Sequence, residues 1–237
     1  CAPKAGSAMN KKRVVSVACL ICGVPLLLAL GVWLIGTERY AAVSAGVALL
    51  SCVPVAVTFE KGKKSGRELA VLAVLTALTV VGRVIFAPVP GFKPVTAMTV
   101  IAGVAFGAEA GFMTGSMSAL ISNIYFGQGP WTPFQMAAWG FIGLLAGLLF
   151  SRRRNPPMML LLIYGAFAGV AFSLIMDIWT TISAEGGFSS ARYLFYVGTA
   201  LPVTAVYAVS NVVFLAILSK PLLRKLERIK IKYGVFE

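Results

Sequence analysis

Long apolar runs, with charged residues confined to the gaps between them, limit what this chain can fold into. The runs span residues 14–36, 40–59, 69–87, 94–106, 110–124, 134–150, 158–182 and 193–219. Most approach the ~20 residues that a helix needs to cross a bilayer. Charged residues make up only 12% of the chain, against roughly 25% in soluble domains. The sequence therefore predicts an all-α polytopic membrane helix bundle, in which the fourth and fifth runs are tilted, broken or partly buried.

Basic residues lie in alternate gaps between these runs. The rich gaps hold Lys11, Lys12, Arg13, Lys61, Lys63, Lys64, Arg67, Arg152, Arg153, Arg154, Lys220, Arg224, Lys225, Arg228, Lys230 and Lys232. The opposite gaps hold Arg39, Lys93 and Arg192. By the positive-inside rule, this alternation predicts about eight spans in a bacterial plasma membrane, with both termini in the cytoplasm.

The formal net charge of +13 also bears on partners. In a soluble protein it would suggest nucleic acid. Here the basic clusters follow apolar runs and lack interleaved aromatic residues, so we expect contact with anionic membrane lipid and no nucleic acid.

Catalysis and metal binding have few residues to build on. The chain has no His, which removes the commonest general base and metal ligand. Cys19 and Cys22 have CxxC spacing, but they lie inside an apolar run without a second pair, so we interpret them as packing thiols. The motifs GxSxG, HExxH and GxxxxGK[ST] do not occur. We expect no enzyme activity, no metal, no cofactor and no ATPase motif.

Basic clusters also divide the chain. Residues 1–13 are expected to be a cytoplasmic leader. Within them, "MNKKR" at 9–13 resembles a natural translation start, so residues 1–8 are interpreted as an artificial addition or as part of an upstream segment. Residues 14–60 form a two-span N-terminal extension and 61–220 a six-span core. The tail 221–237 is expected to be a short basic amphipathic helix on the inner surface.

Glycines recur at helical spacing in "GVAFGAEAGFMTG", where Gly103, Gly107, Gly111 and Gly115 are four residues apart. Such a stripe lets helix backbones approach closely in lipid. We expect a tight turn at residues 108–109 and helix packing on either side of it.

Other small residues follow the same logic. "AVLAVLTAL" places Ala70, Ala73 and Ala77 on one helix, and Ala73 and Ala77 form AxxxA. "GFIGLLAG" is a similar face in the sixth run. Six spans follow a basic loop. The first span carries AxxxA, the glycine segment joins the second and third, and "GFIGLLAGLLF" lies in the fourth. Over residues 67–220 this order resembles the substrate-binding S component of energy-coupling factor (ECF) vitamin transporters.

This resemblance implies a vitamin or related micronutrient bound at the outer end of the bundle. It also implies two kinds of partner, a shared ECF transmembrane coupling subunit and two cytosolic ATPase subunits. The coupling subunit would meet Ala70, Ala73 and Ala77. A loose likeness of "FGQGPWTPFQM" to cobalamin-associated proteins makes cobalamin the first candidate, with riboflavin and other vitamins open.

The resemblance places the ligand at three outward loops, "APVPGFKPV", "YFGQGPWTP" and "AEGGFSSAR". Pro and Gly restrain these loops, and aromatic faces can stack on a flat ring. An aromatic belt at the headgroup level is the alternative interpretation of the second loop. The candidate substrate-binding residues are Arg83, Phe92, Lys93, Asn123, Tyr125, Gln128, Trp131, Gln135, Trp139, Asp177 and Tyr193.

Charged residues inside spans are costly, so they invite functional interpretation. Arg83 and Asp177 both lie toward the outer ends of their runs, where they would pair with each other or contact a ligand. Asn211 lies in the inner half of the last run and is expected to make an interhelical hydrogen bond. A stand-alone secondary transporter, a small membrane enzyme and a structural assembly protein are the alternatives.

Overall fold

The protein is described here by a computed structural model, which covers residues 11–35, 42–43, 45–50, 64–151 and 156–236. The described residues form helices and no strand, which confirms the predicted all-α fold. The elements are α1 (Lys11–Leu30) with the π-helical turn η1 (Gly31–Ile35), α3 (Lys64–Ile85), α4 (Val95–Phe106), α5 (Ala108–Phe126), α6 (Thr132–Phe150), α7 (Met158–Glu185) and α8 (Ser190–Tyr233). Most of the expected second span, 40–59, and the basic cluster 152–154 lie outside the described residues.

Within the described ranges, five helical segments are long and apolar enough to cross a membrane. They are Val14–Trp33, Gly66–Ile85, Thr132–Phe150, Met158–Glu185 and Ser190–Tyr233. α5 is less apolar than these five segments because it contains several polar residues, which are buried inside the bundle: Thr114, Ser116, Ser118, Ser122 and Asn123. The protein is therefore a multi-pass membrane protein with one short apolar helix, α4.

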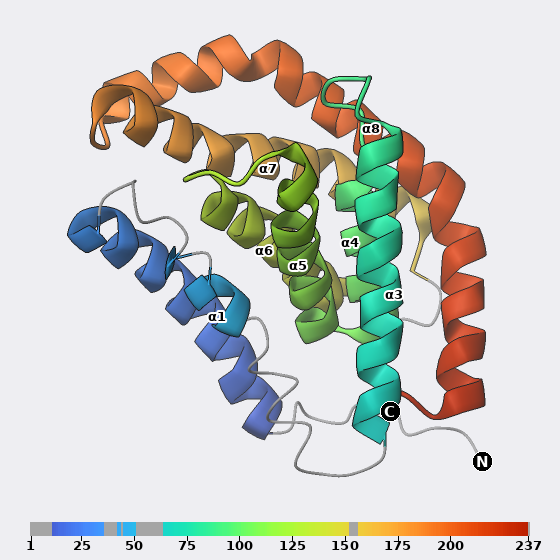
Figure 1. Cartoon of the computed structure of the whole chain (residues 1–237). Coiled ribbons are helices and arrows are strands. Elements are labelled where there is room, and N and C mark those ends of the chain that lie inside the picture. The colour runs from blue at the N-terminus through green and yellow to red at the C-terminus, as the bar shows by residue number, and fades with distance from the viewer. Residues whose placement is uncertain (1–10, 36–41, 44, 51–63, 152–155, 237) are drawn as a thin grey trace.

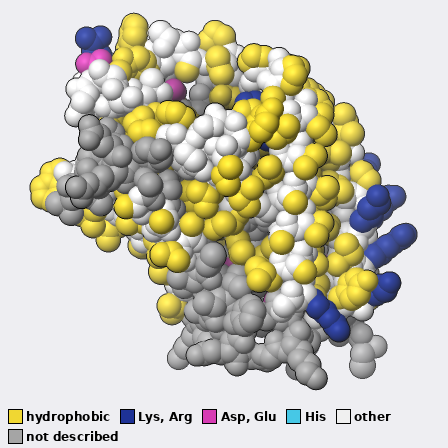
Figure 2. Space-filling model, viewed as in Figure 1, with side chains coloured by type: hydrophobic (Ala, Val, Ile, Leu, Met, Phe, Trp, Pro, Cys, Tyr) yellow, Lys and Arg dark blue, Asp and Glu magenta, His cyan; other side chains and the backbone are white. Residues whose placement is uncertain are grey.

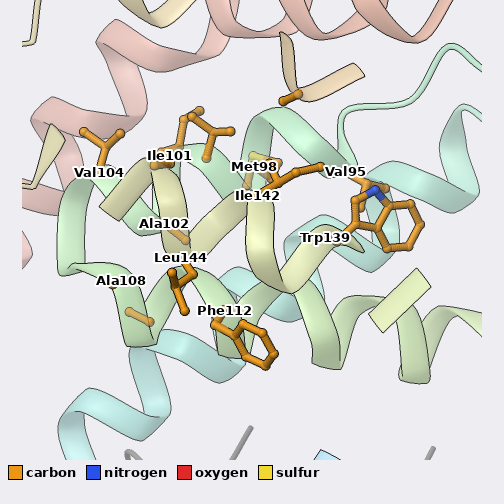
Figure 3. Close-up of a cluster of buried hydrophobic side chains, with 14 of the residues drawn as sticks. Val95, Met98, Ile101, Ala102, Val104, Ala108, Phe112, Trp139, Ile142 and Leu144 are labelled. Atoms are coloured by element: carbon orange, nitrogen blue, oxygen red, sulfur yellow. The ribbon is translucent and has the colours of Figure 1, made fainter. Parts of the chain in front are cut away.

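The short helix α4 is the centre of the bundle. It packs against α3, α5, α6, α7 and α8, and all of its residues except Ala105 are buried. A helix surrounded by protein does not have to match the thickness of the hydrocarbon core, so a helix of 12 residues is long enough at this position. Figure 3 shows Val95, Met98 and Ile101 of α4 beside Trp139 and Ile142 of α6.

Glycines bring α4, α5 and α6 into backbone contact, as the stripe predicts. α4 ends at Phe106, and Gly107 has a φ of 102°, which only glycine adopts at low cost. α5 starts at Ala108, so the turn lies at Gly107 and the expected position at 108–109 is wrong, because both of those residues are helical. A Cβ at Gly103 or at Gly111 would overlap the backbone carbonyl of Gly143 on α6. A Cβ at Gly115 would overlap the carbonyl of Trp139. The glycine segment is therefore a helix-packing motif.

Helices α7 and α8 form a long hairpin around this centre, and α8 curves over the other helices (Figure 1). Pro202 and Pro221 lie inside α8, and each lacks the N–H that an α-helix uses. Asn211 of α8 donates to the Gly165 carbonyl of α7 at 3.1 Å, which confirms the expected interhelical bond. The basic tail is helical, but it continues α8 to Tyr233 and does not form a separate short helix.

The two ends of the bundle differ in character. One end, which we call the basic end, holds the start of α3, the α4–α5 turn and the last turns of α8. Figure 2 shows apolar side chains over much of the visible face, with Lys and Arg side chains along the edge formed by the last turns of α8. The opposite end, which we call the aromatic end, joins the end of α3 to α4 and the end of α5 to α6.

Candidate substrate-binding site

Arg83, at the last turn of α3, is the centre of the aromatic end. Its side chain is 6% exposed. Its Nη1 donates to Ser122 Oγ and, at 2.8 Å, to Asn123 Oδ1 of α5. Its guanidinium lies 4.6 Å from the Phe126 ring centroid and 5.1 Å from that of Trp139. A buried cation is stabilised by such hydrogen bonds and by π faces, so Arg83 ties α3 to α5 and α6.

Asn123 extends this network from α5 to the start of α6. Its Nδ2 donates to Thr132 Oγ1 at 3.0 Å and to Gln135 Oε1 at 2.9 Å. Asn123 is fully buried, and these bonds together with the one from Arg83 use both ends of its amide. The Gln135 amide nitrogen makes no hydrogen bond to the described residues, and its side chain is partly exposed, so Gln135 retains a free donor at the edge of the network.

Gln128 and Trp131 shape the loop between α5 and α6. Gln128 Nε2 donates to the Leu120 carbonyl at 2.8 Å, and its Oε1 accepts from Thr132 Oγ1 at 3.0 Å. The Trp131 indole covers Gly129, where a side chain would collide with the ring. Both polar atoms of Gln128 are thus engaged within the protein, and its predicted contact with a ligand would require these bonds to be exchanged. Tyr125, 70% exposed, packs its ring edge-on against Phe126.

Aromatic residues continue from Arg83 into α7 and α8. Trp139 stacks on Phe172 of α7, with ring centroids 5.1 Å apart and planes 10° from parallel. Phe172 meets Tyr207 of α8 edge to face at 5.3 Å. Sequence reasoning selected Trp139 and missed Phe172 and Tyr207. A single sequence does not reveal whether an aromatic residue on an apolar helix faces the bundle or the lipid.

The α3–α4 loop is fixed against α8 beside this cluster. The Lys93 backbone N–H donates to Ser210 Oγ at 2.9 Å, and that hydroxyl donates back to the Lys93 carbonyl at 3.2 Å. Phe92 packs on Phe214, with centroids 5.0 Å apart. The Lys93 ammonium lies 5.7 Å from the Phe126 centroid. Partial burial lowers the pKa of Lys93 from its usual value, and the positive charge of Arg83 lowers it further.

Asp177 and Tyr193 stand on the α7–α8 hairpin. No ion pair or hydrogen bond joins Asp177 to Arg83 among the described residues. Asp177 is 7% exposed, and its Oδ2 has no hydrogen-bond partner in the described part of the chain. Tyr193 donates to the Leu174 carbonyl at 3.2 Å. Arg83 therefore donates from Nη1 to Ser122 and Asn123 and does not pair with Asp177, and its buried Nε has no hydrogen-bond partner among the described residues.

Replacing Asp177 by Asn should separate stability from binding. A neutral amide costs less to bury than an unpartnered carboxylate, so Asp177→Asn should stabilise the ligand-free protein by roughly 1 kcal/mol. If the carboxylate accepts a ligand hydrogen bond, affinity should fall by roughly 1.5–3 kcal/mol, which is about tenfold or more. Thermal unfolding and ligand titration of purified protein measure the two effects. Glu185→Gln is the control, since Glu185 pairs with Arg192 at the surface. Wild-type affinity in Asp177→Asn would remove Asp177 from the site.

The predicted coupling face lies on α3, away from its packed side. Ala70, Ala73 and Ala77 are all exposed, whereas Leu72 and Leu75 are buried in the core. The exposed stripe is thus unoccupied by the described part of the chain. That is compatible with lipid or with a partner helix.

Comparison with known families was made on the sequence. The family model described as "ECF-type riboflavin transporter, S component" matches residues 63–228. No curated protein and no solved structure matches the chain. The matched range covers well over half of the sequence, contains α3 to most of α8, and confirms the resemblance to ECF S components. The chain is therefore a membrane transport subunit and belongs to the ECF-type riboflavin transporter S component family.

Proposed function

We propose that this chain captures riboflavin at the aromatic end of its bundle and passes it to an ECF module for import. The observation that carries the proposal is the Arg83 cluster: a buried guanidinium that lies against two aromatic rings and bonds to the end of α5, whose Asn123 in turn bonds to the start of α6. Such a frame is preorganised, so a ligand would not have to order it.

Riboflavin combines a flat isoalloxazine ring with a polar edge and a hydroxylated ribityl chain. Phe126, Trp139 and Phe172 supply aromatic rings at this end, and because Trp139 and Phe172 are buried and stacked on each other, a flat ring would bind by separating that pair. The free Gln135 amide and the unpartnered Asp177 oxygen offer one donor and one acceptor for the polar parts. Both kinds of group are needed, because an apolar slot alone discriminates poorly between ring systems.

Cobalamin, the first candidate from sequence, rested only on a loose likeness of the α5–α6 loop, in which both amide ends of Gln128 bond within the protein. The family description names riboflavin instead. We therefore propose riboflavin as the ligand.

Titration of purified protein tests the ligand directly. Riboflavin fluorescence should be quenched on binding, because stacking on an indole ring provides a route for electron transfer. Lumichrome, which has the ring without the ribityl chain, should bind more weakly, and cobalamin should not compete. Trp139→Ala should weaken riboflavin binding about tenfold or more, because it removes an aromatic contact and the apolar area buried with it. Phe167→Ala, at an exposed ring on α7 outside the three outward loops, should leave it unchanged. Absence of quenching, or competition by cobalamin, would overturn riboflavin as the ligand.

The proposal also fixes orientation and partners. With the aromatic end outward and the basic end in the cytoplasm, the exposed α3 face would meet a shared transmembrane subunit that is driven by two cytosolic ATPases. Anionic lipid would contact the basic edge of α8.

Orientation is testable by labelling. A single Cys introduced at Gly186, in the α7–α8 connection, should react with an impermeant thiol reagent in intact cells, because the proposal places that connection outside. A Cys at Tyr233, at the end of α8, should react only after the membrane is permeabilised. Both variants are made after the native cysteines are replaced. The reverse pattern of labelling would invert the proposed topology.

A further inference from the structure

The segment after α8 turns back and closes onto the start of α3 (Figure 1). α8 ends at Gly234, which adopts the left-handed conformation (φ 58°, ψ 40°) that favours glycine. The Gly234 and Val235 N–H groups both approach the Lys230 carbonyl, the latter at 3.3 Å. This cap reverses the chain direction within a few residues, so that Val235 and Phe236 point toward the bundle.

The reversed segment is anchored to two other helices. Val235 is fully buried. The Phe236 ring stacks on Phe106, the last residue of α4, with centroids 4.3 Å apart and planes 28° from parallel. The Phe236 backbone N–H donates to Glu68 Oε1 of α3 at 2.6 Å. We name Gly234–Phe236 the clasp, since it joins the basic ends of α3, α4 and α8.

The clasp fixes the part of α3 that precedes the small exposed face. Glu68 lies two residues before Ala70, so it occupies the same turn of α3 as the beginning of that face. Leu226 of α8 is buried and Ile229 packs against the core, so one face of the last turns of α8 is held to the bundle. The clasp therefore sets the position of this end of α3 relative to α8.

We propose that the clasp positions the α3 face for docking to the ECF transmembrane subunit, with Glu68, Phe106 and Phe236 as positioning residues. The inference rests on the proposed function, because it takes the Ala70, Ala73 and Ala77 face to be the docking surface. Ligand binding happens at the aromatic end, and none of the clasp residues contacts the Arg83 cluster. Loss of the clasp should thus weaken assembly and leave ligand binding intact.

The experiment compares clasp variants in assembly and in binding. Glu68→Ala removes the acceptor for the Phe236 N–H, and Phe236→Ala removes the stacked ring. Each should reduce recovery of the complex with co-expressed ECF subunits, and transport of riboflavin, about fivefold or more. Riboflavin affinity of the isolated chain should stay at the wild-type value. Glu68→Gln, which keeps an acceptor oxygen, should restore assembly, and the exposed neighbour Tyr233→Ala is the matched control.

The outcomes separate this inference from the proposed function. Wild-type assembly in Glu68→Ala and Phe236→Ala would overturn the clasp's role while the proposed function stands. Equal loss of riboflavin binding and assembly would also overturn it, because the segment would then support the whole fold. A wild-type chain that does not assemble with ECF subunits would overturn the proposed function and the inference together.

Discussion

Gly143→Ala should lower the thermal stability of the protein strongly, although it adds a single methyl group. The new Cβ would overlap the Gly111 carbonyl of α5 and lie 2.7 Å from the Thr99 Cγ2 atom of α4. The Gly111 carbonyl is backbone and cannot move aside as a flexible side chain can, and Thr99 is a fully buried, β-branched side chain with little freedom to turn away. Overpacking commonly costs about 1–3 kcal/mol, and a clash with one helix backbone and a buried side chain of a second helix should reach about 3 kcal/mol or more. A protein with roughly 5–15 kcal/mol of total stability then loses a large share of it.

A glycine elsewhere gives the matched control. Gly198 lies inside α8, and a Cβ there would meet no atom within 4 Å. Gly198→Ala should be neutral or slightly stabilising, since alanine is favoured over glycine in helices by roughly 1 kcal/mol. The measurement is the amount of monodisperse protein that remains after heating in detergent, followed by size-exclusion chromatography. Equal melting temperatures for Gly143→Ala and Gly198→Ala would show that the three helices can separate without loss of stability.

Much of this architecture was predictable because bilayers impose simple rules on sequence. The apolar runs predicted α6 and α7 to within a few residues, and the glycine stripe predicted a turn at 108–109 that the structure places just before them, at Gly107. Those features depend on local composition. The expected interhelical bond of Asn211 is also local in origin, because an isolated amide inside a span must find a partner somewhere.

The arrangement of the site was less predictable, because it depends on how each helix is rotated about its axis. Arg83 was selected as a buried charge, but its partners Ser122 and Asn123 are 39 and 40 residues away. Phe167 and Phe172 are both phenylalanines on α7, yet Phe167 is 53% exposed and Phe172 is 6% exposed. Composition cannot tell such residues apart. The closing of Phe236 onto Glu68, across 168 residues, has no local signal either.

Ala73→Trp should abolish import while it spares ligand binding. Ala73 and Ala77 are exposed and one turn apart on α3, so a partner helix could approach closely over them. A tryptophan at that position would hold the two helices apart, and uptake should fall by about tenfold or more, a loss of at least ~1.4 kcal/mol of docking free energy. The Arg83 cluster lies more than two turns along the helix, so riboflavin affinity of the isolated chain should be unchanged.

Lipid exposure is the competing explanation for this face, and a second tryptophan distinguishes the two. Ala216 of α8 is also exposed, and a side chain that faces lipid tolerates an indole well because lipid tails adapt to its shape. Ala216→Trp should therefore transport at the wild-type rate. The assay is uptake of labelled riboflavin by cells that express the chain with ECF subunits, alongside titration of each purified variant. Wild-type uptake in Ala73→Trp would mean that α3 faces lipid there and that the coupling subunit docks elsewhere. Loss of binding together with uptake would place Ala73 in the chain's own packing, against the exposure seen in the structure.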